Sequence, residues 1–386
     1  MKYCSTKPLG TLVSIEKGKK APEVFAAPTP TSLRYLQIED LRPDTTIKYC
    51  EPFTCPKATN LDVIIAWDGA NAGTVSCNLA GHIGSTLAVL RPIEANTLSP
   101  LFLSRFLGSK FDYLQRTATG ATIPHVSKGA LNNLEIPLPP LAEQERIVKL
   151  LDEADALRKL RTKADRRTAA LIPALFQDMF REDGGLQRRW PMRPLGALIS
   201  DGPQNGLYKH SSSYGTGVPI LRIDGFYDGE VEDLTTLKRL HASADEIERY
   251  GLHEHDIVIN RVNSPEYLGK SALIPALFES TVFESNMMRL AVSTEQIEPG
   301  YLIQFLQTPE AKQHILGRAK HSINQSSINQ EDVQCMPIPL PPLPLQKEFA
   351  QRARKIREFE TTQATSRTHL DALFQSILHR AFNGDL

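Results

Sequence analysis

The stretch "IPLPPLAEQERIVKLLDEADALR", residues 136–158, changes character after its first six residues. Proline holds φ at about −65° and has no N–H to donate, so "IPLPPL" predicts a stiff extended connector and neither a helix interior nor a central strand. The residues that follow are mostly Ala, Leu, Glu, Lys and Arg, which favour a helix. The same hexapeptide returns at residues 338–343 and again precedes a helix-forming sequence. The chain therefore contains two elements in which a connector leads into a long helix.

Both predicted helices have the length and pattern of a coiled coil. In the second, apolar residues recur from Phe349 to Phe359 and from Leu370 to Ile377, around a polar middle. Pro173 predicts a kink or a restart in the first helix. Amphipathic core helices of a compact domain are the alternative, but runs of roughly 30 to 40 residues exceed the usual globular length. The first helix has its seam, in alternating steps of three and four, at Ile147, Leu150, Ala154, Leu157, Leu160 or Arg161, Ala164, Thr168, Leu171, Leu175 and Met179.

Segments upstream of the two hexapeptides also occur in pairs and in the same order, which indicates an internal duplication. The pairs are "LGTLVSIEKG" at Leu9 with "LGALISDGPQNG" at Leu195, "YLQIEDL" at Tyr35 with "ILRIDGF" at Ile220, "LDVIIAWDG" at Leu61 with "HDIVINRVN" at His255, and "LSPLFLSRFLGS" at Leu98 with "IEPGYLIQFLQT" at Ile297. Their polar neighbours "AWDGANAGTVSC" and "NRVNSPEYLGKS" differ at nearly every polar side chain. One scaffold is therefore predicted to present two different polar surfaces.

The duplication predicts a mixed α/β (α+β) chain made of two globular domains and two long helices. We expect the first domain at residues 1–141, the central helix at 142–182, the second domain at 183–343 and the C-terminal helix at 344–386. An antiparallel pairing of the helices would give a pseudo-twofold axis. A helix of about 30 to 35 residues spans roughly 50 Å, or about 15 base pairs of DNA. A twofold reader binds two half-sites of a duplex, and unlike domains would read unlike half-sites.

The composition favours a reduced, intracellular protein without indicating a partner. Lys and Arg total 44 and Asp and Glu total 44, so any charged surface must be local. The five cysteines are odd in number and form no CxxC pair or zinc-type cluster. The opening "MKYCSTKPLG" has no apolar signal core, and no apolar run is long enough to cross a membrane. We expect a cytoplasmic protein.

The repeated segments resemble the repeats of a known family, the DNA specificity subunits of type I restriction-modification systems. The resemblance rests on "IPLPPLAEQERIVKLLDEADALR", "IPLPPLPLQKEFAQRARKIREF" and the helix ends "LFQDMF" and "LFQSIL". It covers the entire chain, including the order of domain, helix, domain and helix, with "GHIG", "GATIPHVS" and "VPILRIDGF" as the matching framework within the domains. The second copy departs from the family pattern at Leu345-Gln346, where the usual pair is Glu-Gln.

The resemblance implies a subunit that recognises double-stranded DNA and has no catalytic centre. Each target-recognition domain would read one half of a split sequence, while the helices fix the gap and dock two modification subunits. Those partners would bind S-adenosylmethionine and methylate adenine, and restriction subunits would add cleavage and translocation driven by ATP and Mg²⁺. The chain itself is expected to bind no cofactor and no metal.

Two other functional classes were weighed against this one. A DNA-modifying enzyme acting alone would resemble known amino-methyltransferases in an Asn- or Asp-Pro-Pro-aromatic turn, but Pro139-Pro140 and Pro341-Pro342 are flanked by leucines. "YLGKS" at residues 267–271 lacks the first glycine of a nucleotide-binding loop, and "HEHD" at residues 253–256 predicts a strand start more than a metal site. A proline-motif adaptor would not explain the duplicated domains.

Candidate base and phosphate contacts were sought in the loops where the two copies differ, because a rigid scaffold carries such side chains on loops. Arg and Lys suit guanine, and Asn and Gln suit adenine. In the first domain the candidates are Trp67, Asp68, Asn71, Thr119, Thr122, His125 and Lys128. In the second domain they are Asn260, Arg261, Asn263, Lys270, Lys320, Asn324, Gln325 and Ser326, with Gln204, Asn205, Tyr208 and Lys209 in a second loop. Any one of them read alone is equally compatible with a solvated loop residue or a turn former.

Partner contacts and spacing were predicted from the first helix. Its charged residues mostly indicate a solvated face. If the seam is buried, the outward apolar residues predicted to dock partners are Leu151, Ile172, Leu175 and Phe176. The "ALF" motifs at Ala174 and Ala372 are offset by 198 residues and the hexapeptides by 202, so the first helix region is four residues longer. Four residues add about 6 Å to a helix.

Overall fold

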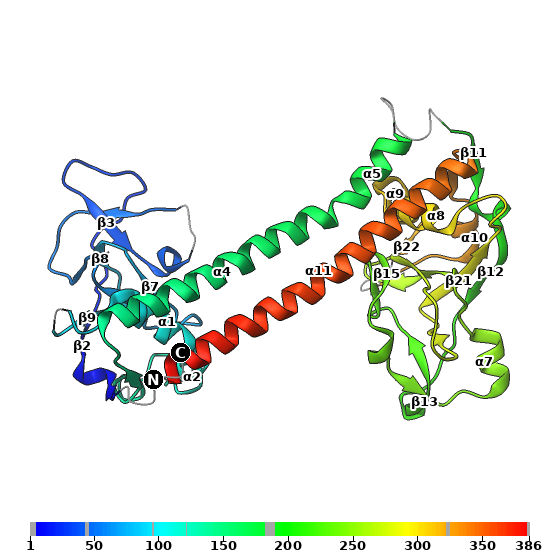
Figure 1. Ribbon diagram of the computed structural model, residues 1–386. Helices are drawn as coiled ribbons and strands as arrows, with labels where there is room; N and C mark the ends of the chain where they lie inside the picture. Colours follow the sequence, from blue (N-terminus) through cyan, green and yellow to red (C-terminus); the bar gives the residue numbers. More distant parts are fainter. Residues whose placement is uncertain are drawn as a thin grey trace. The chain divides into compact units, whose positions relative to one another are not determined.

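The computed structural model describes residues 5–42, 46–94, 96–120, 122–181, 190–321 and 325–383. The chain divides into two compact units, which are described separately. Unit 1 comprises Met1–Lys163 and Ala364–Leu386, and unit 2 comprises Ala164–Gln363. Each unit thus holds one mixed α/β domain together with the adjoining parts of two long helices (Figure 1). We call the globular parts domain 1 and domain 2.

Domain 1 is built on two four-stranded sheets. The first is antiparallel in the order β2 (Val13–Lys17), β9 (Leu87–Pro92), β6 (Val63–Ala66) and β7 (Val75–Cys77). The second has the order β4 (Tyr49–Cys50), β3 (Leu33–Leu36), β8 (Gly81–Ile83) and β5 (Lys57–Ala58), with a parallel β3–β8 pair. All four residues of β6 are buried, which explains why its sequence is continuously apolar and does not alternate.

Domain 2 repeats this arrangement with an extended main sheet. The sheet has the order β12 (Ile199–Asn205), β21 (Met287–Val292), β17 (Ile257–Asn260), β19 (Ser271–Leu273), β15 (Gly229–Val231) and β14 (Phe226–Tyr227). A second sheet has the order β16 (Arg239–Leu240), β13 (Tyr214–Leu221) and β20 (Val282–Phe283). The parallel β13–β20 pair corresponds to the parallel β3–β8 pair of domain 1. The predicted duplication and mixed fold class are therefore confirmed.

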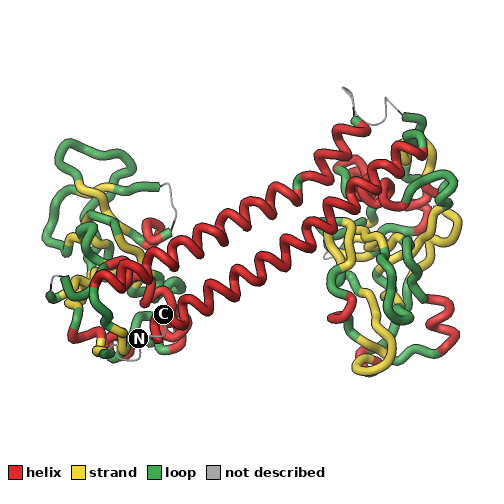
Figure 2. The backbone as a smooth tube through the Cα atoms, in the orientation of Figure 1, coloured by secondary structure: helices red, strands yellow, loops and turns green. Residues whose placement is uncertain are grey.

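Each domain also contains short helices, of which α1 and α8 pack on the main sheets. Domain 1 has α1 (Pro100–Ser109), α2 (Phe111–Arg116) and α3 (Lys128–Asn132), and domain 2 has α7 (Ala244–Tyr250), α8 (Pro299–Leu306), α9 (Pro309–Arg318) and α10 (Gln330–Gln334). Proline occupies the first turn of α1 and of α8, a position where its missing N–H has no cost. These two helices occupy corresponding places, because α1 packs on β6 and β7 and α8 packs on β19, the neighbour of β17. Figure 2 shows the helices of each domain in red beside the strands in yellow.

Each "IPLPPL" copy closes its domain and starts a long helix. Its first residues form β10 (Glu135–Pro137) or β24 (Pro337–Pro339), which pair with β1 (Thr6–Pro8) and β11 (Met192–Pro194). The helices that follow are α4 (Leu141–Ala169), α5 (Leu171–Phe180) and α11 (Leu343–Asn383). The predicted restart is confirmed between α4 and α5, because Pro173 has no N–H to donate to the carbonyl of Ala169.

Within each unit the two long helices run antiparallel. In unit 1, Ile147 and Leu151 share a buried cluster with Phe382, whereas further along α4 Arg158 bonds Asp371 at 2.6 Å. In unit 2, Thr168 meets Gln363 at 3.1 Å. Further along, Phe176 on α5 packs edge-to-face against Phe349 with ring centroids 5.5 Å apart. As the residue numbers rise along α4 and α5, the numbers of the α11 residues that they contact fall. This is what the predicted antiparallel pairing requires.

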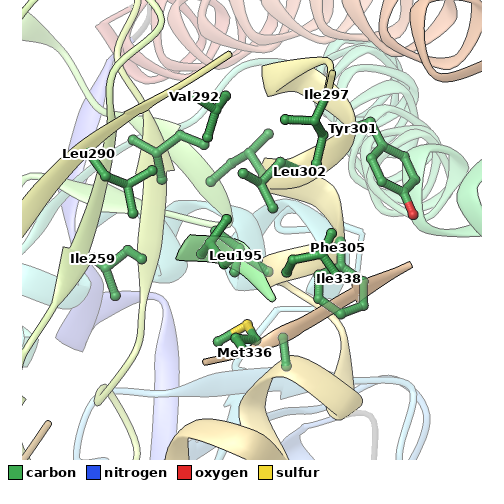
Figure 3. Close-up of a cluster of buried hydrophobic side chains, with 14 of the residues drawn as sticks. Leu195, Ile259, Leu290, Val292, Ile297, Tyr301, Leu302, Phe305, Met336 and Ile338 are labelled. Carbon is green, nitrogen blue, oxygen red and sulfur yellow. The ribbon is translucent and has the colours of Figure 1, made fainter. Parts of the chain in front are cut away.

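The core of each domain extends into both long helices. In unit 2 the cluster joins α8 and the main sheet to Ile172, Phe176 and Phe180 of α5 and to Phe349 of α11. Figure 3 shows part of this cluster, with Leu302 of α8 on the side of Leu290 and Val292 of β21, and Tyr301 on the opposite side of α8. In unit 1 the corresponding cluster joins α1 to the start of α4 and the end of α11. Domain and helices therefore share one hydrophobic core in each unit.

Part of the predicted seam is buried, including Ile147 and Thr168, but leucines in its middle are exposed, and the residues predicted to face outward are covered. Leu157 and Leu160, assigned to the seam, are 52% and 63% exposed. Leu151, Ile172 and Phe176, assigned to partner docking, are buried in the cores just described, and Leu175 is half-buried against the same core. The outward placement of these docking residues was therefore wrong.

The physical reason is that the domains, and not only the partner helix, cover the long helices. Docking the large apolar residues Leu151 and Phe176 against the domains turns polar residues of α4 toward α11. These are Arg158, whose guanidinium lies 4.5 Å from the centroid of Phe374, and Thr168. The middle of the helix pair is consequently polar, and apolar leucines remain on its outer face.

Candidate nucleic-acid interface

The first strand of each main sheet ends at a glycine that must lie against backbone. A Cβ on Gly18 would come within 2.3 Å of the Ile83 carbonyl oxygen, and one on Gly206 within 2.5 Å of the Phe283 carbonyl oxygen. Only glycine fits such an approach. The two glycines align in the duplicated sequence. They bring the ends of β2 and β12 to equivalent places beside the loop that follows the central strand.

Domain 1 brings four of its predicted residues together in a short ribbon. Asp68, just after β6, forms a β-bridge with His125, and His125 forms a second bridge with Thr119. The Thr119 and His125 backbones exchange hydrogen bonds of 2.9 and 2.7 Å. The N–H of Val126 donates to the Trp67 carbonyl at 2.9 Å. Two loops that are some fifty residues apart in sequence are thereby joined at the end of the central strand.

Domain 2 forms the same ribbon from the residues that the sequence alignment paired with these. The strands β18 (Val262–Asn263), β23 (Ser326–Ser327) and β22 (Lys320–His321) make a three-stranded sheet in that order of pairing. Asn263 faces Ser326, and Lys320 faces Ser327. The scaffold of the candidate interface is therefore duplicated, while the side chains that it carries differ.

The charges of the domain 1 ribbon meet at Asp68. Lys17 Nζ lies 2.7 Å from one carboxylate oxygen, and His125 Nδ1 lies 2.6 Å from the other. Burial alone would raise the pKa of Asp68, but the hydrogen bonds from Lys17 and His125 outweigh it and hold the pKa below its ordinary value. Asp68 therefore orients two potential donors and carries a charge that is locally balanced.

Sequence reasoning missed two cationic residues of this site. Lys17 contacts Asp68, and the Arg42 guanidinium donates to the Asn71 amide oxygen. Both side chains come from segments remote in sequence. Lys17 could have been found, because it directly precedes the glycine that aligns with Gly206; nothing in the sequence pattern singles out Arg42. Thr119, Thr122 and Lys128 are exposed beside or just beyond the ribbon.

Two predicted base contacts in domain 2 were wrong. Asn260 is 0% exposed and Ser326 is 2% exposed, so neither side chain reaches the surface. Asn260 belongs to the central strand β17, and its amide donates to the Tyr267 carbonyl at 3.3 Å. Ser326 faces inward from β23. Asn260 is buried because both faces of the central strand β17 are covered, whereas strand alternation turns Ser326 of β23 inward. The loop composition alone could not reveal either.

Lys270 lies inside an aromatic enclosure. Its ammonium is 3.8 Å from the Tyr227 ring centroid and 4.6 Å from that of Phe226, and it donates to the Ile223 carbonyl at 2.6 Å. Burial lowers the pKa of this lysine. The side chain is therefore committed to holding its loop against β14, and the predicted DNA contact is not supported by its position.

The second predicted loop of domain 2 is partly committed to its own domain. Gln204 donates to the Arg249 carbonyl at 2.7 Å, and Lys209 pairs with Glu246 at 2.7 Å. Both partners belong to α7. Asn205 and Tyr208 remain exposed. This loop has polar groups free for recognition at two of its four predicted positions.

Arg261 stands between this loop and the ribbon. Its guanidinium donates to the Ser285 carbonyl at 3.2 Å, and the Ser285 N–H donates to the Leu207 carbonyl at 3.0 Å. The Arg261 carbonyl accepts from Ile328, next to β23. Exposed or half-buried candidates that remain in domain 2 are Asn205, Tyr208, Arg261, Asn263, Lys320 and Gln325. Asn324 lies outside the described residues.

The described residues offer little for chemistry of another kind. Among them, no group of three or more His, Cys, Asp or Glu side chains could hold a metal ion. In "HEHD", His253 and Asp256 lie 3.6 Å apart, and His255 approaches Glu254 at 3.8 Å. None of the helices in the described part of the chain is long and apolar enough to span a membrane.

Comparison with known proteins identifies relatives along the entire chain. The type I restriction enzyme EcoKI specificity subunit of Escherichia coli (strain K12) is 26% identical over 356 residues, covering 84% of this chain and 75% of that protein. The MjaVIII specificity subunit of Methanocaldococcus jannaschii is 25% identical over 399 residues, covering 98% and 92%.

Solved structures share the fold. A chain from a type I restriction-modification system, solved to explain complex assembly and conformational transition, aligns with a TM-score of 0.63 at 22% identity and covers 99% of this chain and 98% of its own. The S subunit of M. genitalium aligns with a TM-score of 0.59 at 14% identity, covering 98% and 96%.

The family match follows the duplication that both sequence and structure display. Residues 4–166 and 207–367 each match the family described as the type I restriction modification DNA specificity domain. The first match includes domain 1 with its ribbon and most of α4, and the second begins after β12 and includes the rest of domain 2, with its ribbon, and the first part of α11. The chain therefore belongs to the family of type I restriction-modification DNA specificity subunits.

Proposed function

We propose that this chain is the non-catalytic DNA-reading subunit of a type I restriction-modification assembly and that each domain reads one half of a split sequence. The observation that carries the proposal is the duplicated ribbon. The same three segments meet after β6 and after β17, but Asp68, Thr119 and His125 are replaced by Val262, Lys320 and Ser327. A common scaffold with different polar groups suits two unlike half-sites.

The proposal assigns chemistry to partner subunits. S-adenosylmethionine would be held by two modification subunits, and ATP with Mg²⁺ by restriction subunits, so that this chain binds no cofactor. The absence of an amino-methyltransferase turn from the sequence supports this division. The assembly would work on DNA in the cytoplasm.

The long helices offer an outer apolar face for the modification subunits. Its residues on α4 are Leu157 and Leu160, which replace the residues predicted from sequence. Leu171 on α5 and Phe359 and Leu373 on α11 are also about half exposed. Large apolar side chains on solvent-facing helix positions are typical of protein contact sites. We assign these five residues to partner docking.

A binding experiment tests the reading role directly. The chain, co-purified with its modification subunits, should bind a duplex carrying both half-sites at least about a thousandfold more tightly than random DNA at the same salt concentration. Scrambling either half-site alone should remove most of that preference. Equal affinity for all sequences would contradict the proposal. Methyl transfer by the chain without partners would contradict the non-catalytic part.

A further inference from the structure

A buried glutamine occupies the same position at both joints between a domain and its long helix. Gln144 and Gln346 each lie eight residues after the start of "IPLPPL", and both are 0% exposed. Their neighbours differ, since "AEQERI" surrounds the first and "LPLQKEF" the second. The shared side chain is therefore retained where the adjacent helix sequence has diverged.

In unit 1 the Gln144 amide joins three backbone segments. Its Oε1 accepts from the N–H of Ser99 at 2.8 Å, and its Nε2 donates to the carbonyls of Thr97 and Pro139, both at 2.9 Å. Ser99 is the N-cap residue of α1. One side chain on α4 thus holds the entrance of α1 and the proline connector together, with both amide hydrogens used.

In unit 2 the Gln346 amide makes two of these three contacts. Its Oε1 accepts from the N–H of Glu298, the N-cap residue of α8, at 3.0 Å, and its Nε2 donates to the Pro341 carbonyl at 2.7 Å. A second bond supports this joint, because the Tyr301 hydroxyl donates to the Pro339 carbonyl at 2.9 Å. Phe102 occupies the corresponding place in domain 1 and has no hydroxyl.

A short chain of packed elements links each glutamine to the candidate DNA-reading ribbon. In unit 1, α1 packs on β6 and β7, and the ribbon begins where β6 ends. In unit 2, α8 packs on β19, the sheet neighbour of β17, and β18 follows β17. Fixing α1 or α8 on its long helix therefore fixes the direction in which the ribbon faces. Such packed elements transmit small rotations without absorbing them.

Building on the proposed function, we propose that Gln144 and Gln346 are positioning residues that set the angle of each recognition domain on its helix and thereby the selectivity for the gap between half-sites. They touch no base. Their loss leaves buried backbone groups without partners, which loosens the joint while the base-reading side chains stay in place. A purely structural role would instead lower binding to every gap length alike.

The test uses the complete assembly of this chain with its modification subunits. Methylation is measured on a set of duplexes that carry both half-sites at the native gap and at gaps one and two base pairs shorter or longer. The variants are Gln144→Met and Gln346→Met, which keep side-chain length and remove the amide. Gln351→Met is the matched control, because Gln351 lies exposed on the same helix as Gln346.

We expect both glutamine variants to lose selectivity for the length of the gap, Gln144→Met more than Gln346→Met. The bases recognised in each half-site should stay the same. Gln144→Met should reduce the preference for the native gap about tenfold, the order of one lost buried hydrogen bond. Gln346→Met should reduce it less, since Tyr301 still holds the connector, and adding Tyr301→Phe should bring it to the level of Gln144→Met. If Gln144→Met does not assemble, the test compares Gln346→Met with the double variant Gln346→Met and Tyr301→Phe.

Two results would overturn the inference. One is a gap preference in the glutamine variants equal to that of Gln351→Met, and the other is a change in the half-site bases with the gap preference intact. Failure of the proposed function is distinguishable, because the unaltered assembly would then methylate no split sequence at any gap and the inference would fall with it.

Discussion

Asp68 shows how one carboxylate organises the domain 1 ribbon. It lies between Lys17 from β2 and His125 from the second loop, and its bonds to both hold its pKa below the ordinary value. A carboxylate whose pKa is lowered by folding stabilises the folded state fully at pH values above its unfolded-state pKa of about 3.9. This stabilisation is lost as the pH falls through the lower pKa of the folded state. Asp68 therefore stays ionised through the neutral range.

Asp68→Asn should lower the free energy of unfolding by about 1 kcal/mol at pH 7, because two charge-assisted bonds to a partly exposed carboxylate are lost. The deficit should stay constant down to about pH 5 and shrink only below about pH 4, where the wild-type carboxylate also becomes protonated. Urea unfolding followed by tryptophan fluorescence measures it, since Trp67 adjoins the site. A deficit that grows as the pH falls would contradict this assignment.

Arg261→Ala should weaken binding to the cognate duplex by about 1 to 3 kcal/mol and relax one position of the second half-site. Its guanidinium lies between the ribbon and the second loop of domain 2, where a base contact is geometrically plausible. Affinity selection from a randomised half-site measures both effects. Unchanged affinity and unchanged base preference would remove Arg261 from the interface.

Two lysines provide the contrast for Arg261. Lys128→Ala, at an exposed position just beyond the ribbon, should weaken binding to all sequences alike and lower the salt slope by about one. Lys270→Met should destabilise domain 2 without altering base preference, because the ammonium is held by Tyr227, Phe226 and a backbone carbonyl. A change of base preference in Lys270→Met would instead support the original prediction that Lys270 contacts DNA.

At the residue scale the sequence predicted which loops come together better than which of their side chains are exposed. Aligning the two copies placed the loops around His125 and Ser326 correctly, because their register against the central strand is duplicated. It could not show that Asn260 and Ser326 are buried, since a loop composition reveals neither strand alternation nor which strand is covered on both faces. Nor could it reveal Arg42, whose contact with Asn71 depends on tertiary folding.

The long helices are the elements on which assembly and spacing depend. The sequence predicted their antiparallel pairing and the restart before Pro173, because heptad-like spacing and proline chemistry are local properties. It placed the docking residues on the outer face wrongly, because the domains also pack on these helices and bury Leu151, Ile172 and Phe176. The helix pair consequently meets through Arg158 and Thr168.

Leu160→Asp should weaken assembly with the modification subunits without unfolding the chain, because this side chain is 63% exposed. Size-exclusion chromatography of the mixed subunits and thermal unfolding of the chain measure the two effects. Phe176→Asp is the matched contrast. It should destabilise unit 2 by more than about 3 kcal/mol, because Phe176 packs against Phe180, Tyr301 and Phe349. Normal assembly of Leu160→Asp would remove α4 from the docking face.

Deleting four residues between Lys159 and Arg167 should change the accepted gap between half-sites. Four residues correspond to about 6 Å of helix, or roughly two base pairs. This part of α4 crosses from unit 1 into unit 2. Replacing the same four residues by alanine is the control for altered composition, and methylation of duplexes with graded gaps is the measurement. An unaltered gap would mean that α4 does not set the spacing.

The chain contains two copies of one module, and the copies differ in the ribbons that are proposed to read DNA. Parallel strand pairs, "IPLPPL" joints, buried glutamines and close-packed glycines recur at corresponding places. The sequence revealed this duplication because framework segments retain their order, and the family match at residues 4–166 and 207–367 follows it. The side chains of the two ribbons diverged instead, which accounts for one scaffold serving two half-sites.

The central claim is that two unlike domains read one split sequence. The most direct measurement is methylation mapping by long-read sequencing, after co-expression of this chain with its modification subunit in an otherwise unmethylated host. The account predicts methylated adenines in a single motif made of two different half-sites and a fixed gap. Methylation within one continuous motif, or none from an intact and cofactor-bound assembly, would contradict it.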